Sequence, residues 1–179
     1  RQVFVDQLTA TLQGVAKDAR IQVDFNAQRV RRYRLIGYEN RDIEDKRFRD
    51  DTIDAGEVGS GQCSTALYEV ELQGDPEEAL GTVFVRYRDV HTDQMQEIAR
   101  PLSSKIIRDY KVEQAPRFFL AAGVGRFAEW LRQSEHVQVG DLPQIAQTIE
   151  KVSRALPLDR DVRALAQLIR QAEHLPRAP

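Results

Sequence analysis

The chain has 179 residues, which is enough for one domain or for two small domains that share an interface. Hydrophobic residues make up 41% and charged residues 30%, the proportions of a folded globular protein, and this composition excludes intrinsic disorder. A formal net charge of -2 excludes a general attraction to nucleic acid or to an anionic membrane. We therefore expect no nucleic-acid partner. No apolar run approaches the roughly 20 residues that cross a bilayer, so we also expect no transmembrane segment.

Residues 1–14 place Phe4, Leu8 and Leu12 at helical spacing. The first residue is Arg1 and the sole methionine is Met95, so we expect the natural protein to begin earlier. The segment is predicted to be the end of a linker or helix from a preceding domain. Its apolar stripe would then lie at the junction with that domain, because such a stripe needs a cover.

Five segments between residues 15 and 102 show the period of two that strands require. Four of them are 15–25, 30–39, 66–72 and 83–87, and 94–102 is a weaker fifth. The turn at Asn26–Gln28 favours a hairpin between the first two segments. Because no long helix separates the strands, residues 15–112 are predicted to form a mainly antiparallel, sandwich-like β unit.

From Pro116 the hydrophobic period changes to that of helices. A buried stripe is predicted at Leu120, Val124, Phe127 and Leu131, and two later helices should begin after the N-cap candidates Asp141 and Asp159. Residues 113–179 therefore form a predicted three-helix unit packed on the β unit, and the fold class is α+β.

An acidic, glycine-containing loop spans residues 50–61 and suggests a calcium site. The spacing of the EF-hand fails, because a loop that starts at Asp50 has Ala55 in the position of the turn glycine and Gly61 in that of the bidentate glutamate. We expect an exposed acidic turn and a flat calorimetric titration with calcium. Its carboxylates remain candidates for an interaction surface: Asp50, Asp51, Asp54 and Glu57.

Residue types that support catalysis are scattered. Cys63 is the single cysteine, and the histidines lack zinc-binding spacing. Gly123-Val124-Gly125 fits a dinucleotide fingerprint, but it lies inside a helical pattern, where glycines favour close packing. We predict no cofactor, metal or enzyme activity. The alternative is a hydrolase that uses Cys63 or the acidic loop, and it requires a base such as His91 within hydrogen-bond distance.

An RNA-binding module is a second alternative. Residues 81–87 partly match an RNA-recognition motif, with Phe84 and Tyr87 as stacking aromatics. A basic strip lies at Arg29 and at the interaction candidates Arg31, Arg32 and Arg34. This alternative requires the aromatic and basic groups to share one exposed face, whereas arginines commonly protect a strand edge.

Four sequence blocks, 19–26, 33–41, 50–61 and 65–69, carry a family resemblance. In order and spacing they resemble the uncharacterised C-terminal region that follows the von Willebrand factor type A domain in bacterial envelope proteins. The resemblance implies a location after such a domain in an exported protein, periplasmic or surface-exposed and often lipid-anchored. It implies no activity. The Asp-x-Ser-x-Ser metal motif of type A domains is absent from this chain.

The resemblance and the scattered catalytic residue types together predict a non-catalytic interaction or structural module. The expected partners are the protein's own N-terminal type A domain and a further protein that the sequence does not identify.

Overall fold

The computed structural model describes residues 14–37, 47–52 and 55–174. These residues divide into two compact units: a β unit that ends at Ile107, and a helical unit that comprises residues 35–37 and continues from Arg108. Antiparallel sheets followed by three helices confirm the α+β class. The packing of the helical unit on the β unit stays a prediction.

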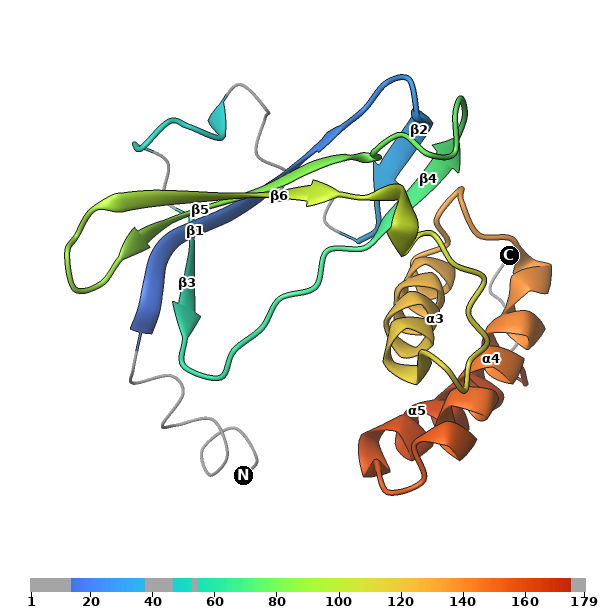
Figure 1. Ribbon diagram of the computed structural model, residues 1–179. Coiled ribbons are helices and arrows are strands. Elements are labelled where there is room, and N and C mark those ends of the chain that lie inside the picture. The colour runs from blue at the N-terminus through green and yellow to red at the C-terminus, as the bar shows by residue number, and fades with distance from the viewer. Residues whose placement is uncertain (1–13, 38–46, 53–54, 175–179) are drawn as a thin grey trace. The chain divides into compact units, whose positions relative to one another are not determined.

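The larger sheet of the β unit has four strands in the order β3-β1-β5-β6, and each neighbouring pair is antiparallel. β1 and β5 lie at its centre, with β6 beside β5 (Figure 1). The strands have these bounds: β1 Gly14–Phe25, β3 Gly56–Gly59, β5 Gly81–Asp89 and β6 Met95–Leu102. β1, β5 and β6 follow the predicted segments.

β1 contains an irregularity that decides which side chains share a face. Asp18 has a φ of 51°, and the pairing with β5 slips between Lys17 and Arg20. An extra residue at such a bulge reverses the alternation of side chains. From Arg20 onward the pairing is regular, so odd-numbered residues of β1 lie on one face and even-numbered residues on the other.

The smaller sheet pairs β2 (Val30–Leu35) with β4 (Tyr68–Leu72). The predicted hairpin between β1 and β2 is therefore wrong. Both edges of β1 are already taken by β3 and β5. The turn after β1 instead bonds to the segment before β5, through Asn26 N to Leu80 O at 2.8 Å and Asn26 Nδ2 to Ala79 O at 3.1 Å.

The helical unit contains α3 (Pro116–Leu131), α4 (Leu142–Ala155) and α5 (Arg160–Ala172), drawn from gold to red in Figure 1. Pro116 occupies the first turn of α3, as predicted. Asp159 caps α5, because its side chain accepts hydrogen bonds from the backbone N–H groups of Asp161 and Val162. Asp141 precedes α4, but its carboxylate bonds to Gln138 N and does not cap α4.

The core of the helical unit lies between these helices, around fully buried Ile149 and Ile169. The predicted buried stripe of α3 is partly wrong. Phe127 is buried, but Val124 is 43% exposed and Leu131 57% exposed. The buried face of α3 instead contains Gly123, Phe127 and Trp130, which follow i, i+4, i+7 spacing.

Candidate interaction surface

One side of the four-stranded sheet carries a continuous row of apolar side chains. Ile21 of β1 pairs with Val85 of β5, and Val85 pairs with Ile98 of β6. Directly paired residues project from the same face of a sheet, so the three side chains lie side by side. Val23 and Val83 form the next pair along the same face. We call this surface the apolar face: Ile21, Val23, Val83, Val85 and Ile98.

Among the described residues, aromatic side chains of the smaller sheet contact this side at Phe25. Phe25, on the same face of β1, contacts Tyr33 of β2 with ring centroids 4.7 Å apart and Tyr68 of β4 at 5.4 Å. These aromatic contacts join the two sheets. Within the β unit as described, the end of the apolar face at Ile21 and Ile98 makes no such aromatic contact.

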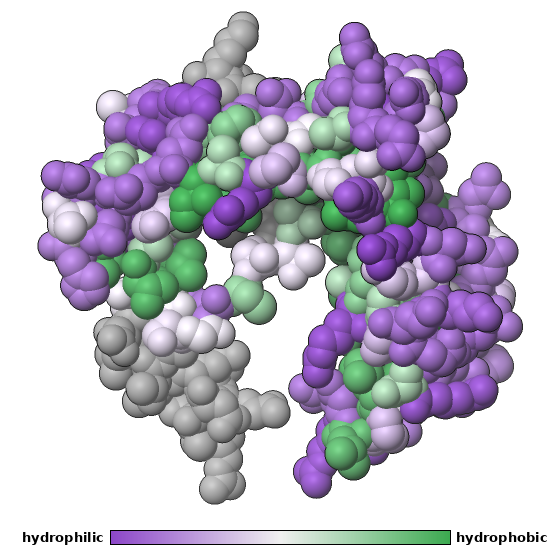
Figure 2. All heavy atoms as spheres, viewed as in Figure 1, coloured by the Kyte–Doolittle hydropathy of each residue, from purple (hydrophilic) through white to green (hydrophobic). Residues whose placement is uncertain are grey.

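This end of the apolar face is accessible to solvent. Ile21 is 49% exposed and Ile98 is 42% exposed, although isoleucine is among the residues most often fully buried. Figure 2 shows apolar surface gathered over part of the β unit, next to strongly hydrophilic surface. A row of apolar groups across three strands is the kind of surface that protein partners cover.

The opposite side of the sheet is covered by residues 47–52, which we call the clasp. The Phe48 ring is 3% exposed and meets Phe84 of β5 edge-on at 6.5 Å. Arg20, only 4% exposed, donates from Nη1 to the carbonyl oxygens of Phe48 at 3.1 Å and Asp50 at 2.7 Å. Arg49 lies over the Phe84 ring at 5.5 Å. This face of the sheet is therefore occupied within the chain itself.

Ion pairs tie the clasp to the strands. Arg49 Nη2 lies 2.8 Å from Glu97 Oε1, and Arg86 Nη2 lies 2.8 Å from Asp51 Oδ1. The hydrogen bond from Arg49 lowers the pKa of the Glu97 carboxyl, and the neighbouring Arg86 lowers it further. Glu97 is consequently held ionised below its ordinary titration range.

A further ion pair lies at the bulge of β1. Arg88 donates to Asp18 Oδ2 at 3.1 Å, and this bond lowers the pKa of Asp18. The pair fixes the side chain of the residue that causes the change of register.

The predicted basic candidates lie on β2 and pair with β4. Arg31 Nη1 is 3.0 Å from Glu71 Oε1, Arg32 Nε is 3.9 Å from Glu71 Oε2, and Arg34 Nη2 is 2.7 Å from Glu69 Oε2. Exposed pairs of this kind add little stability but neutralise charge. The three arginines form cross-strand ion pairs with glutamates of β4. The positive charge of the predicted basic strip is therefore partly neutralised.

The acidic candidates are not gathered into one cluster. Asp50 bonds to its neighbour Thr52, and Asp51 pairs with Arg86. Glu57 is exposed on β3, and Asp54 lies outside the described residues. No group of three or more metal-ligating side chains occurs in the part of the chain that the structure describes. The flat calcium titration stays a prediction.

The apolar candidates Phe4, Leu8 and Leu12 lie outside the described residues. Cys63 is exposed, and no hydrogen bond joins it to a histidine within the described ranges. His91 lies in the turn between β5 and β6, where its backbone N–H donates to Asp89 Oδ1. The base that the hydrolase alternative requires at Cys63 is therefore not found among these residues.

The RNA-binding alternative fails its own geometric requirement. Phe84 pairs with Ala99 and Tyr87 pairs with Gln96, so the two aromatics are three positions apart on one strand. They project from opposite faces of β5. Phe84 is further covered by the clasp.

Sequence reasoning missed the apolar face as a site. Ile21, Val85 and Ile98 occupy predicted strand positions, where apolar residues are typical of a core. The alternation of apolar and polar residues along these strands does not indicate which apolar side chains are exposed. Only the pairing of the strands, with the clasp on one side and solvent on the other, distinguishes the two faces.

The family model for the C-terminal region of the uncharacterized protein YfbK matches residues 10–175. The uncharacterized protein YfbK of Escherichia coli (strain K12) is 39% identical over 74 residues, which is 41% of this chain. The match covers 13% of that relative, so the chain corresponds to a small part of a longer protein. No solved structure matches the chain. Among the described residues, no helix is both long and apolar enough to span a membrane.

Proposed function

Because the chain belongs to the family of YfbK C-terminal regions, we propose that it is a non-catalytic interaction module that docks on a von Willebrand factor type A domain of the same protein. The single observation that supports this proposal most directly is the exposed end of the apolar face, at Ile21 and Ile98. A surface of this kind needs a cover, and domains of one chain cover one another through such interfaces.

The length of the relative and the resemblance support this choice of occupant. Most of the E. coli relative lies outside the region that this chain matches, so a longer protein supplies candidate neighbours. The sequence blocks resemble a region that directly follows a type A domain. The apolar face also suits a fixed neighbour, because intrachain docking pays a smaller entropy cost than capture of a separate protein.

The proposal includes export to the cell envelope, which rests on the same resemblance. Fractionation of cells that produce the full-length protein tests this part. Recovery with periplasmic or membrane fractions supports it, and recovery only with cytoplasm contradicts it.

Thiol labelling tests the docking. In the full-length protein, in a background free of other cysteines, Ile98→Cys is compared with Ile106→Cys, which replaces an apolar residue that is 55% exposed outside the apolar face. Docking should slow labelling at position 98 at least about tenfold relative to position 106, which corresponds to about 1.4 kcal/mol. Equal rates would contradict the proposal.

A second protein as the occupant is a distinct outcome. In that case labelling at position 98 would be slow in cells and fast in the purified full-length protein. That result would replace the type A domain as the docking partner.

A further inference from the structure

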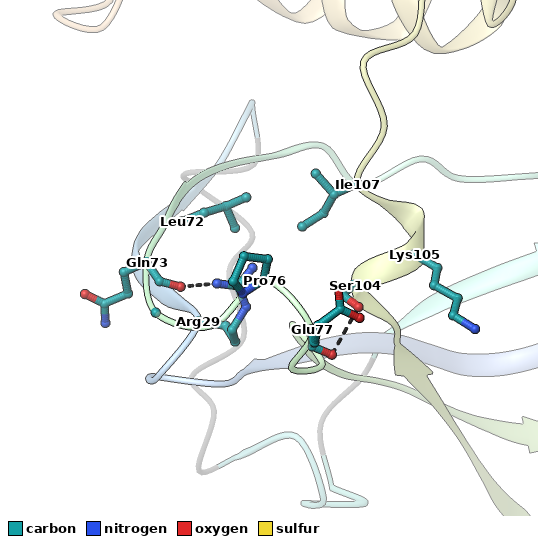
Figure 3. Close-up of a pocket in the computed structure, with 9 residues that line it drawn as sticks. Arg29, Leu72, Gln73, Pro76, Glu77, Ser104, Lys105 and Ile107 are labelled. Atoms are coloured by element: carbon teal, nitrogen blue, oxygen red, sulfur yellow. Dashed lines mark hydrogen bonds between the residues drawn. The ribbon is translucent and has the colours of Figure 1, made fainter.

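The β unit contains a second feature, a cavity of about 530 Å³ that shares no residue with the apolar face. Its volume lies in the range of small-ligand sites, roughly 300–1,000 Å³. The residues that matter for its chemistry are Arg29 before β2, Leu72 at the end of β4, Pro76 after β4, and Ser104 and Ile107 after β6. Figure 3 shows Arg29 and Pro76 on one side of the cavity, with Ile107 opposite and Lys105 extending away.

Arg29 is a buried cation with few partners. It is 3% exposed, and its guanidinium donates from Nη1 to the carbonyl oxygen of Gln73. Its Nε is buried and has no hydrogen-bond partner. Leaving a buried charged donor unpaired is costly, because water is lost and nothing replaces it.

Arg20 gives a useful contrast within the same unit. Its guanidinium donates to three backbone carbonyls, those of Asp18, Phe48 and Asp50. The positive charge of Arg20 also contributes to lowering the pKa of the Asp18 and Asp50 carboxyls. Arg20 Nη2 is also buried without a hydrogen-bond partner, but the rest of its guanidinium has three carbonyl acceptors, whereas that of Arg29 has one.

Arg29 has less compensation among the described residues, because its guanidinium donates to one carbonyl oxygen, that of Gln73. The nearby carboxylates of β4, Glu69 and Glu71, pair with Arg34 and Arg31. Across the described ranges, no carboxylate lies within ion-pair distance of Arg29. The guanidinium is nevertheless held at this position by its bond from Nη1 to Gln73 O, while the backbone of Arg29 accepts from Gln73 N at 2.8 Å.

The geometry points to a binding site for a carboxylate carried on an apolar stem, such as the C-terminal end of a peptide. The carboxylate would accept from Arg29, whose planar fork matches carboxylate oxygens. The stem would contact Leu72, Pro76 and Ile107, the apolar lining of the same cavity. Ser104 Oγ, which donates to Glu77 O at 3.2 Å, lies at the far rim.

The negative charge of Glu77 limits the charge of a ligand that the cavity favours. It lines the cavity on the side of Ser104 (Figure 3) and makes no ion pair with Arg29. Lys105 also lines the cavity, but its side chain extends away from it (Figure 3), so one guanidinium lies beside one carboxylate. This arrangement suits a monoanion better than a phosphate dianion, because Glu77 repels each added negative charge.

Calorimetric titration of the protein with N-acetyl-Ala-Leu-Leu tests the site, with the C-terminal amide of the same peptide and sodium acetate as the other arms. The free acid should bind saturably, and the amide and acetate should bind at least about tenfold more weakly, because one lacks the charge and the other the stem. Equal affinity for the acid and the amide would show that the site does not recognise the carboxylate. Equal affinity for the acid and acetate would show that it does not recognise the apolar stem.

Matched variants assign the binding to the cavity. Arg29→Gln should weaken binding of the acid at least about tenfold, whereas Arg31→Gln, the same change at an exposed arginine of β2, should leave it unchanged. If Arg29→Gln does not fold, Ile107→Asp places a repelling charge in the cavity without altering Arg29, with Ile106→Asp as its neighbour outside the cavity. Equal effects within either pair would overturn the site.

Discussion

Gly123 is a position where α3 lies close against α4. A Cβ added there would lie 2.6 Å from Ile149 Cδ1 and 3.1 Å from Cγ1, and Ile149 is fully buried. We predict that Gly123→Ala lowers the free energy of unfolding by up to about 2 kcal/mol. Overpacking costs about 1–3 kcal/mol, while alanine regains about 1 kcal/mol of helix propensity. Chemical denaturation measures the difference.

The control for this prediction is Ile149→Val, which removes the Cδ1 that the new methyl group meets. In the double-mutant cycle, Ile149→Val should cost less in the Gly123→Ala background than in the wild type, with a coupling of more than about 0.5 kcal/mol. Simple additivity would show that the two side chains do not compete for the same space.

Glu97 is expected to influence how the stability of the β unit depends on acidic pH. Its folded pKa is lowered, first by the bond from Arg49, and the unfolded value is about 4.3. Its stabilisation is therefore present above that pH and is lost as the pH falls through the folded pKa. We predict that Glu97→Gln unfolds with a shallower loss of stability below about pH 4 than the wild type. Denaturant midpoints from pH 2 to 7 measure this.

The matched control is Glu113→Gln, because Glu113 is exposed and forms no ion pair within the described residues. That variant should keep the acid dependence of the wild type. If stability fell equally steeply with decreasing pH in both variants, Glu97 would not contribute to the acid dependence.

At the scale of elements, the periodicity of the sequence predicts where most strands lie but not how they pair. β1, β5 and β6 match the period of two, whereas β1 pairs with β3 and β5 and not with β2. Pairing depends on contacts distant in sequence, which a local pattern does not contain. β3 was missed because it has four residues, of which two are glycines and one, Val58, is apolar.

The helices illustrate a different limit. Their starts were predictable, because Pro116 and Asp159 act through local chemistry. The buried face of α3 was not, because the helix is apolar on more than one side: Val124 and Leu131 are exposed while Phe127 is buried. Hydrophobic spacing cannot choose between two apolar faces.

The cap of α5 allows a clean test at this scale. Asp159→Ala removes the acceptor for two backbone N–H groups, so we predict a loss of about 1 kcal/mol in the free energy of unfolding. Asp159→Asn keeps an oxygen acceptor and should lose much less. Thermal or denaturant unfolding followed by circular dichroism measures both. Equal losses for Ala and Asn would show that the negative charge, and not the acceptor, stabilises α5.

At the scale of the whole molecule, the family was predictable from sequence blocks and the interaction surface was not. The candidates chosen for charge, such as Arg34 and Asp51, mostly pair with other residues of the β unit. Ile21 and Ile98 are apolar strand residues, which sequence alone assigns to a core. Their exposure depends on the register of three strands and on the clasp that covers the opposite face.

The docking proposal predicts what the apolar face touches in the complete protein. Ile98 lies at its exposed end, so a photoreactive p-benzoylphenylalanine at position 98 would sample the occupant directly. Position 106, on a different exposed surface of the β unit, is the control.

The most direct measurement is therefore photo-crosslinking of the full-length protein in its native cells, with the products mapped by mass spectrometry. The account predicts an intramolecular cross-link from position 98 to the type A domain, and none from position 106. Cross-links from position 98 only to another protein, or the same products from both positions, would contradict it.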